Sequence, residues 1–199
     1  GTNSERSTVS TGQKSLLGKA RARPDLVKKV LQSVQRDGLV NAMQKVQAQL
    51  ESWKTLGCST AGVVVEVGEG VSGYRVGDRV ACAGQDKASH ADYVNVPANL
   101  CAVVPEGVDF QHACFTTVGT IALQGVRQAE VKLGEVVAVI GLGLVGQLSV
   151  QILKAAGCTV LGIDISAGAC QLALESGADA VAVRGKDDVE SIALGLSRG

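Results

Sequence analysis

The chain has 199 residues, enough for one large domain or two small ones with a buried core. It is 46% hydrophobic, with 25 glycines and 3% aromatic residues, a composition typical of a globular protein built on small aliphatic side chains and tight turns. The 19 basic and 19 acidic residues balance, which disfavours nucleic acid or an anionic membrane as a partner. We find no signal-peptide pattern and no apolar stretch of bilayer length, and we expect a cytoplasmic protein.

The six cysteines are scattered through apolar runs, and none belongs to a C-x-x-C pair. This spacing favours small buried thiols in a reducing compartment over a disulfide framework or a zinc knuckle. The six are Cys58, Cys82, Cys101, Cys114, Cys158 and Cys170.

The first quarter of the chain is polar and has helical periodicity. Pro24 suits the first turn of one helix, Gly38 supplies its C-terminal stop, and residues 40–50 carry a second apolar stripe. Basic residues cluster between positions 14 and 29. Such a cluster is more often a solvated helix face than a phosphate-binding patch.

Residues 56–105 change to short β-branched segments separated by glycine turns, which indicates a small barrel-like all-β domain. We expect strands at 62–67, after 74–80, at 90–96 and at 100–104, with a turn at 68–70.

From residue 113 onward, helical and strand patterns alternate. A helix through residue 126 precedes the alternating elements, and this alternation predicts a parallel sheet with right-handed crossovers. The expected order is strand 136–140, helix 145–156, strand 160–165, helix 169–176 and strand 180–183.

A glycine motif, G-x-G-x-x-G, occupies residues 141–146, directly after the first strand of this region and at the start of the next helix. This context is the one that a dinucleotide-binding loop requires. Gly141 permits the tight turn, Gly143 lets the backbone approach a pyrophosphate, and Gly146 allows the helix to pack closely on the strand. The helix N-terminus offers free N–H groups to the phosphates.

An acidic residue, Asp164, ends the second strand 23 residues after Gly141 (164 − 141), close to the spacing of about 20 for a ribose-binding acid. Its carboxylate would accept hydrogen bonds from the ribose hydroxyls and repel a 2′-phosphate, and residues 165–169 contain no Arg or Lys. NAD is therefore favoured over NADP. The residues assigned to the cofactor are Gly141, Gly143, Leu144, Val145, Gly146, Asp164 and Ile165.

A small β domain followed by this Rossmann unit resembles the medium-chain dehydrogenase/reductase superfamily, which includes zinc-type alcohol dehydrogenases and quinone oxidoreductases. The resemblance implies an α/β plus β fold: a GroES-like β-barrel domain at 1–118 with a helical insertion at about 12–52, then a partial Rossmann doubly wound parallel sheet at 119–199. The matching motifs are at 61–64, 67–68, 76–80, 96–97, Thr120 and 141–146.

The helical arm resembles that of a bacterial group of two-domain oxidoreductases associated with polysaccharide or sugar-nucleotide pathways, which implies a sugar-like substrate. Residues 1–3 resemble the segment that follows the catalytic cysteine of zinc members. The sheet also stops after about three of six expected strands. We therefore expect a fragment, incomplete at both ends.

Zinc members place a His-Glu pair where this sequence has Cys58 and Ser59, and a third ligand, a cysteine, would fall near Thr116, two residues from Cys114. A catalytic zinc needs three converging protein ligands. We therefore expect no metal, and zinc chemistry is disfavoured.

Another group must then polarise the substrate or donate a proton. The resemblance implies a proton-relay hydroxyl at Thr2 and a threonine beside the nicotinamide at Thr120, and the predicted catalytic residues are Thr2, Cys58 and Thr120. Ser59, His90 and Tyr93 remain candidates, although surface or packing roles suit the last two better, and His112 suits the first turn of the connecting helix.

These features predict an NAD-dependent dehydrogenase or reductase that transfers hydride between the nicotinamide and an alcohol or carbonyl substrate without catalytic zinc. Two alternatives remain open: a quinone-reductase-like NADPH enzyme, and a non-catalytic NAD-binding module beside a downstream oxidoreductase domain. The expected partner is a small-molecule substrate, and a homodimer is plausible from the family habit of pairing Rossmann edges.

Overall fold

The computed structural model describes residues 55–197, together with Val9 and Gly38. The chain divides into two units, residues 1–57 and 58–199, and nearly all described residues belong to the second. The two helices predicted for the N-terminal arm, and Thr2, lie outside the described residues. Gly38 has a φ of +82°, the left-handed conformation that a helix-stop glycine adopts.

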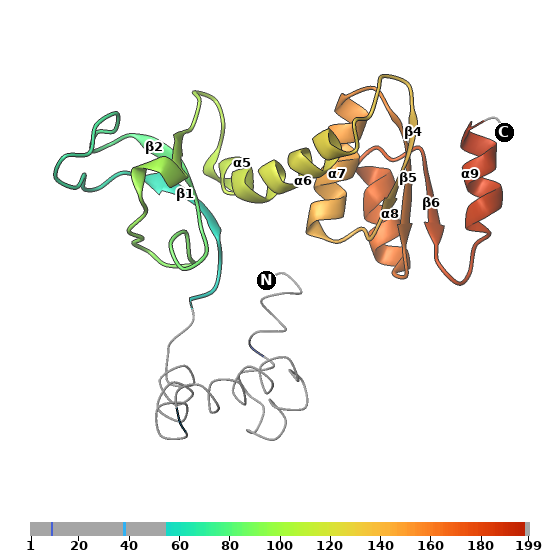
Figure 1. Cartoon of the computed structure of the whole chain (residues 1–199), viewed down its shortest axis with the longest axis horizontal. Helices are drawn as coiled ribbons and strands as arrows, with labels where there is room; N and C mark the ends of the chain where they lie inside the picture. The colour runs from blue at the N-terminus through green and yellow to red at the C-terminus, as the bar shows by residue number, and fades with distance from the viewer. Residues whose placement is uncertain (1–8, 10–37, 39–54, 198–199) are drawn as a thin grey trace. The chain divides into compact units, whose positions relative to one another are not determined.

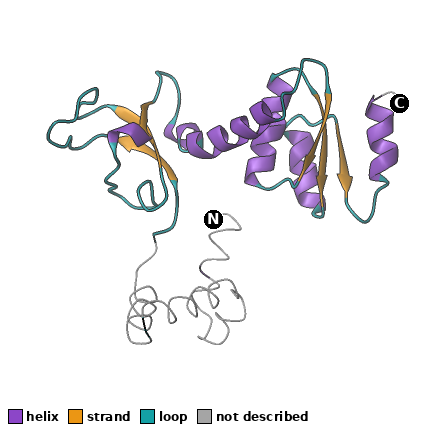
Figure 2. Cartoon of the chain, in the orientation of Figure 1, coloured by secondary structure: helices purple, strands orange, loops and turns teal. Residues whose placement is uncertain are grey.

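The first part of the second unit is a three-stranded antiparallel sheet with the strand order β1-β2-β3. Ala61 of the first strand pairs with Ala81, and Val80 pairs with Val103. The elements are β1 (Ser59–Val63), β2 (Arg79–Ala83), the short 3-10 helix η1 (Ala98–Leu100) and β3 (Cys101–Val103), and Figure 2 shows them with their connecting loops.

Both faces of the central strand β2 are buried, as the alternation of side chains along a strand requires. Val80 and Cys82 pack with Ala88 on one face, whereas Ala81 packs with Val104 and with Ala113 of a following helix on the other. In the described residues this sheet has three strands and does not close into the predicted barrel.

Two strand predictions for this region need correction. The strand predicted at 62–67 begins at Ser59 and ends at Val63. The strand predicted at 90–96 is wrong, because these residues form bends and irregular loop. Their polar–apolar alternation matched a half-buried strand, but it reflects a loop that packs Val96 against the sheet and leaves Tyr93 79% exposed.

Two helices, α5 (Phe110–Ala113) and α6 (Thr116–Gln128), follow this sheet. The Ser59 hydroxyl donates a hydrogen bond to the Cys114 carbonyl between them, and the Thr117 hydroxyl donates to the Cys82 carbonyl at 3.3 Å. These bonds attach the start of α6 to β1 and β2.

The second part is a parallel sheet with the order β4-β5-β6. The predicted strands at 136–140 and 180–183 are confirmed, and the other predicted elements are shifted by one or two residues. The elements are β4 (Val136–Ile140), α7 (Leu144–Ala155), β5 (Thr159–Asp164), α8 (Ala167–Glu175), β6 (Ala180–Val183) and α9 (Val189–Ser197).

Helices cover both faces of this sheet, with α7 and α8 on one face and α9 on the other (Figure 1). Val160 of the central strand packs with Val150 of α7 on the first face, and Leu161 and Ile163 pack beneath α9 on the second. All four are buried. An apolar strand covered on both faces is what a parallel α/β sheet requires.

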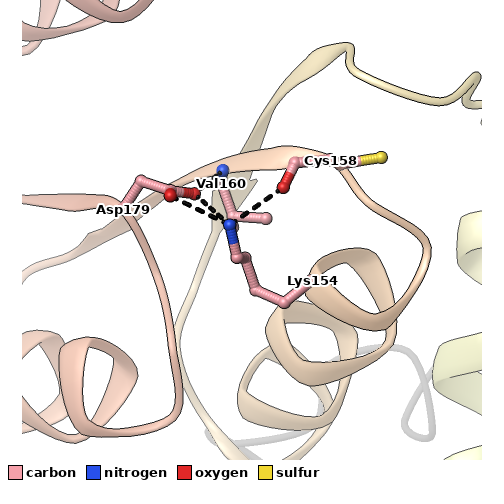
Figure 3. Close-up of polar contacts among 4 residues, drawn as sticks. All are labelled: Lys154, Cys158, Val160 and Asp179. Atoms are coloured by element: carbon pink, nitrogen blue, oxygen red, sulfur yellow. Dashed lines mark hydrogen bonds and ion pairs between the residues drawn. The ribbon is translucent and has the colours of Figure 1, made fainter.

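The amino ends of β5 and β6 are joined by a polar cluster, drawn in Figure 3. The Lys154 ammonium, near the end of α7, lies 2.7 Å from Asp179 Oδ2 and donates to the Cys158 carbonyl at 3.1 Å. Asp179 Oδ2 also accepts the Val160 N–H at 2.7 Å. One carboxylate thus holds a helix end, the start of β5 and the turn before β6.

Candidate functional site

The candidate site begins at the turn between β4 and α7. Gly141 has a φ of +91°, a conformation that disfavours any residue with a Cβ. Its N–H donates to the Ile163 carbonyl at 2.8 Å, which carries the β4–β5 ladder one bond past the strand end. The glycine therefore lets the chain turn sharply at the carboxyl end of the sheet.

The other two glycines of the motif differ in what the protein requires of them. A Cβ at Gly146 would lie 2.0 Å from the Gly141 carbonyl oxygen, so only glycine lets α7 pack this closely on the loop. At Gly143, φ is −70° and a Cβ would meet nothing within 4 Å. Packing and backbone conformation do not explain a glycine there, whereas close approach of a ligand to the backbone would.

Gly143 is also the N-cap of α7, and no side chain caps this helix end. The first bond into the helix runs from the Gln147 N–H to the Gly143 carbonyl at 2.9 Å. The N–H groups of Leu144, Val145 and Gly146 therefore have no acceptor within the helix. Their dipoles make this end attractive to an anion such as a phosphate.

Asp164 ends β5 and lies directly beside this loop. Its Oδ2 accepts the Leu142 N–H at 2.7 Å, and its Oδ1 accepts the Ser166 N–H at 2.8 Å. These bonds, first that from Ser166 and then that from Leu142, hold the pKa of the Asp164 carboxyl below its ordinary value of 3.8. The side chain is ionised at neutral pH, and each oxygen keeps a lone pair for a further donor.

No Lys or Arg occurs in residues 165–169, directly after Asp164, whereas Arg184, directly after β6, donates its backbone N–H to the Asp164 carbonyl at 2.8 Å. Ile165 is 80% exposed, and the Ser166 hydroxyl caps α8 by accepting the Ala169 N–H at 3.4 Å. The structure thus brings the seven predicted cofactor residues to one edge of the sheet, where β4 and β5 end.

Sequence reasoning missed Gln147, whose side chain is 7% exposed. Its amide nitrogen donates to the Leu142 carbonyl at 3.1 Å and to the Ala169 carbonyl at 2.9 Å, and so links the glycine loop to α8. Its Oε1 is buried without a hydrogen-bond partner. The apolar residues Leu144, Leu148 and Ile152 indicated a different face of α7, whereas the buried face carries Gly146, Gln147, Val150 and Leu153.

Two of the three predicted catalytic residues, Cys58 and Thr120, lie in the described part of the chain. Cys58 is half-buried just before β1, and its carbonyl accepts the Gly84 N–H at 3.0 Å. Thr120 is exposed on α6, and its hydroxyl donates to the Thr116 carbonyl at 2.7 Å. The roles of both residues stay predictions.

Ser59, one of the two residues at the positions of the zinc-ligand pair, contacts the segment that contains Cys114 and Thr116. The Ser59 hydroxyl reaches the Cys114 carbonyl, and the Thr116 hydroxyl donates to the Ala113 carbonyl at 2.7 Å. Within residues 55–197, however, no three His, Cys, Asp or Glu side chains gather closely enough to hold a metal ion.

The remaining polar candidates lie on the surface. His90 is exposed in the loop after β2, as is Tyr93, and His112 is exposed in α5. Of the helices the structure describes, none is long and apolar enough to cross a membrane.

Comparison with known proteins agrees with this architecture. Residues 27–106 match the alcohol dehydrogenase GroES-like domain. D-guloside 3-dehydrogenase of Shigella flexneri is 36% identical over 126 residues, which are 62% of this chain and 35% of that protein. (R,R)-butanediol dehydrogenase of Bacillus subtilis is 34% identical over 159 residues, which are 68% of this chain and 46% of that one.

Among solved structures, Escherichia coli quinone oxidoreductase in complex with NADPH matches with a TM-score of 0.64 at 29% identity. The match covers 73% of this chain and 46% of that one. The chain thus spans about a third to a half of the length of these relatives.

A GroES-like segment followed by a parallel sheet with a glycine-rich turn defines a two-part nucleotide-binding fold. Within that class, the chain belongs to the medium-chain dehydrogenase/reductase superfamily.

Proposed function

We propose that this chain binds NAD as part of an oxidoreductase that transfers hydride between the nicotinamide and an alcohol or carbonyl substrate. The observation that carries the proposal is the direct contact between an ionised Asp164 and the glycine loop, through the Leu142 N–H at 2.7 Å. This contact supports the proposal, because the acid proposed to bind the ribose then lies next to the helix end proposed to bind the phosphates.

The residues fit the cofactor that the fold implies. The free N–H groups of Leu144, Val145 and Gly146 would bind the pyrophosphate, and the open backbone at Gly143 permits its approach. Asp164 would accept hydrogen bonds from the adenosine ribose. The bound nicotinamide supplies the hydride acceptor or donor.

NAD is preferred over NADP because the ionised Asp164 carboxylate would repel a 2′-phosphate, and Ile165 beside it offers no positive charge. The similarity to an NADPH-bound quinone oxidoreductase supports the alternative, a quinone-reductase-like NADPH enzyme. Titrating the protein with NADH and with NADPH, followed by nicotinamide fluorescence, separates the two. The proposal requires the lower Kd for NADH, and equal or tighter binding of NADPH would contradict it.

For the substrate we propose a polyhydroxylated, sugar-like alcohol or its ketone, handled without catalytic zinc. The names of two relatives, a guloside and a butanediol dehydrogenase, support a hydroxylated carbon as the reacting centre. Thr2, Cys58 and Thr120 are the proposed polar groups. NADH formation from NAD with glycosides and polyols, compared with consumption of NADH or NADPH in the presence of quinones, tests this proposal in the full chain. NADH binding without turnover of any of these compounds would instead indicate a cofactor-binding module.

A glycine substitution offers a sharper test of the loop. Gly143→Ala meets no atom within 4 Å and keeps an allowed φ, so the melting temperature should change little. If a pyrophosphate approaches this backbone, the added methyl group should weaken NADH binding by about tenfold or more. Gly125→Ala, at an equally open position on α6, is the control and should leave the Kd unchanged. Unchanged NADH affinity in Gly143→Ala would contradict the assignment.

Three further expectations stay predictions. They are the domain boundary at 118/119, which falls within α6, the cytoplasmic location of the protein, and the homodimer.

A further inference from the structure

Two cysteines face each other across the antiparallel sheet, outside the candidate cofactor site. Cys82 of β2 is paired in register with Cys101 of β3, and their Sγ atoms lie 3.7 Å apart. Both are free thiols.

The hydrogen-bond pattern shows that Cys82 and Cys101 are a non-hydrogen-bonded pair, the type of antiparallel pair whose side chains lie closest. The Val104 N–H donates to the Arg79 carbonyl at 2.8 Å, which makes 79 and 104 a hydrogen-bonded pair. Because the two types alternate along an antiparallel ladder, 82 and 101 form a non-hydrogen-bonded pair. The Cys101 N–H accordingly donates to the Ala98 carbonyl of η1 and not to β2.

Such a pair satisfies the main geometric demand of a disulfide. Cα atoms of a non-hydrogen-bonded pair lie about 4.5 Å apart, within the range of about 4.4–6.8 Å that disulfides span. The sulfur atoms must approach by less than 2 Å to reach bonding distance of about 2.05 Å, which side-chain rotation can supply without a change of strand register.

We propose that Cys82 and Cys101 are a redox modification site, a dithiol that a low-molecular-weight disulfide such as oxidised glutathione converts to a cross-strand disulfide. The half-buried Cys101 reacts first: its thiolate attacks one sulfur of the oxidant, forms a mixed disulfide and releases one glutathione thiol. Cys82 then attacks Cys101 Sγ and releases the second. The two cysteines lose two electrons and two protons, and the oxidant is reduced to two thiols.

The burial of Cys82 sets the rate of the second step. Burial, reinforced by the hydrogen bond with Cys101, raises the pKa of the Cys82 thiol to about 12. Little Cys82 thiolate exists at neutral pH, so ring closure is slow there and should accelerate about tenfold for each pH unit. The resulting bond would join the two ends of the loop 83–100.

The test uses the full chain, treated with oxidised glutathione, after which remaining thiols are alkylated and the protein is digested with trypsin without reductant. Cleavage after Arg79, Lys87 and Arg127 separates Cys82, in peptide 80–87, from Cys101, in peptide 88–127. We expect these peptides to remain linked within a monomer, with a mass lower by two hydrogen atoms, and to separate on reduction.

Because Cys114 lies in the same peptide as Cys101, three variants complete the test. The link should persist in Cys114→Ser and disappear in Cys82→Ser and in Cys101→Ser. Three outcomes would overturn the proposal: no linked peptides from a protein whose circular dichroism shows an intact fold, a link that survives Cys101→Ser, or a link found only in covalent dimers.

Discussion

At the scale of single residues, Asp164 serves the fold and the proposed cofactor with the same carboxylate. It accepts the backbone N–H groups of Leu142 and Ser166, which fixes the position of the glycine loop relative to the start of α8. The negative charge that these bonds stabilise is also the charge that would distinguish NAD from NADP. Loss of the charge should therefore alter cofactor preference more than total affinity.

Asp164→Asn removes the charge and replaces one acceptor oxygen with a donor. We expect the ratio of NADPH to NADH affinity to rise about tenfold, or about 1.4 kcal/mol, since the repulsion of a 2′-phosphate is lost. Fluorescence titration with both cofactors measures this ratio. Asp78→Asn is a matched control, because the Asp78 carboxylate also accepts a backbone N–H, from Arg75 at 2.7 Å, but lies in the antiparallel part of the chain. An unchanged ratio in Asp164→Asn would remove the basis for the NAD preference.

Gln147→Leu should destabilise the glycine loop, because it removes the buried amide that links this loop to α8. It leaves the Leu142 and Ala169 carbonyls without their buried donor, at a cost of roughly 1–3 kcal/mol in the free energy of unfolding. The Kd for NADH should rise several-fold as well, because the loop loses its link to α8. Gln151→Leu changes an exposed glutamine one turn along α7 and should alter neither quantity. Equal behaviour of the two variants in thermal melts and NADH titration would argue against this role for Gln147.

At the scale of elements, α7 is positioned at both ends by specific contacts. Gly146 lets its first turn lie against the Gly141 carbonyl, and Lys154 ties its last turn to Asp179. The side chains of Lys154 and Asp179 are 30% and 35% exposed, so the ion pair alone contributes little. Because Asp179 also accepts the Val160 N–H, we expect its removal to lower the free energy of unfolding more than removal of Lys154.

Asp179→Ala should therefore lower the free energy of unfolding by about 1–2 kcal/mol at pH 7, and Lys154→Met by less than about 1 kcal/mol. Lys154 first, and then the Val160 N–H, lower the pKa of the Asp179 carboxyl below 3.8. Its contribution is therefore complete above that ordinary value and is lost as the pH falls through the lowered one.

Denaturant unfolding at pH 7 and at about pH 3 measures both effects. The difference between wild type and Asp179→Ala should shrink at the lower pH. A difference that grows on acidification, or a larger effect from Lys154→Met, would contradict this account of the cluster.

At the scale of the whole molecule, ligand binding should be coupled to the stability of the parallel sheet. The proposed NAD site draws on the loop after β4, the start of α7 and the end of β5, so binding requires these elements to be folded together. At a concentration of 100 times its Kd, NADH should stabilise the protein by about 2.7 kcal/mol. Thermal melts across a concentration series measure this shift, and a melting temperature that does not depend on NADH would exclude specific binding to the folded chain.

Much of the parallel part could be predicted because its information is local. The strands at 136–140 and 180–183 are short apolar runs, and the glycine turn prescribes its own backbone through the φ of +91° at Gly141. The position of Asp164 beside the glycine loop could be predicted from its spacing. The antiparallel part was harder, because a polar–apolar alternation such as that of 90–96 describes an exposed loop as well as a strand.

The sequence by itself determined the order of elements from α6 to β6, the glycine loop and the acid that accompanies it, since each is encoded within a few residues. Only the tertiary structure decided which distant groups meet. It placed the Asp164 carboxylate on the Leu142 N–H, buried Gln147 between the loop and α8, and set Cys82 opposite Cys101. These contacts depend on strand register and helix packing, which join segments about 20 residues apart, and the side-chain pattern of a single segment does not specify its partner atoms.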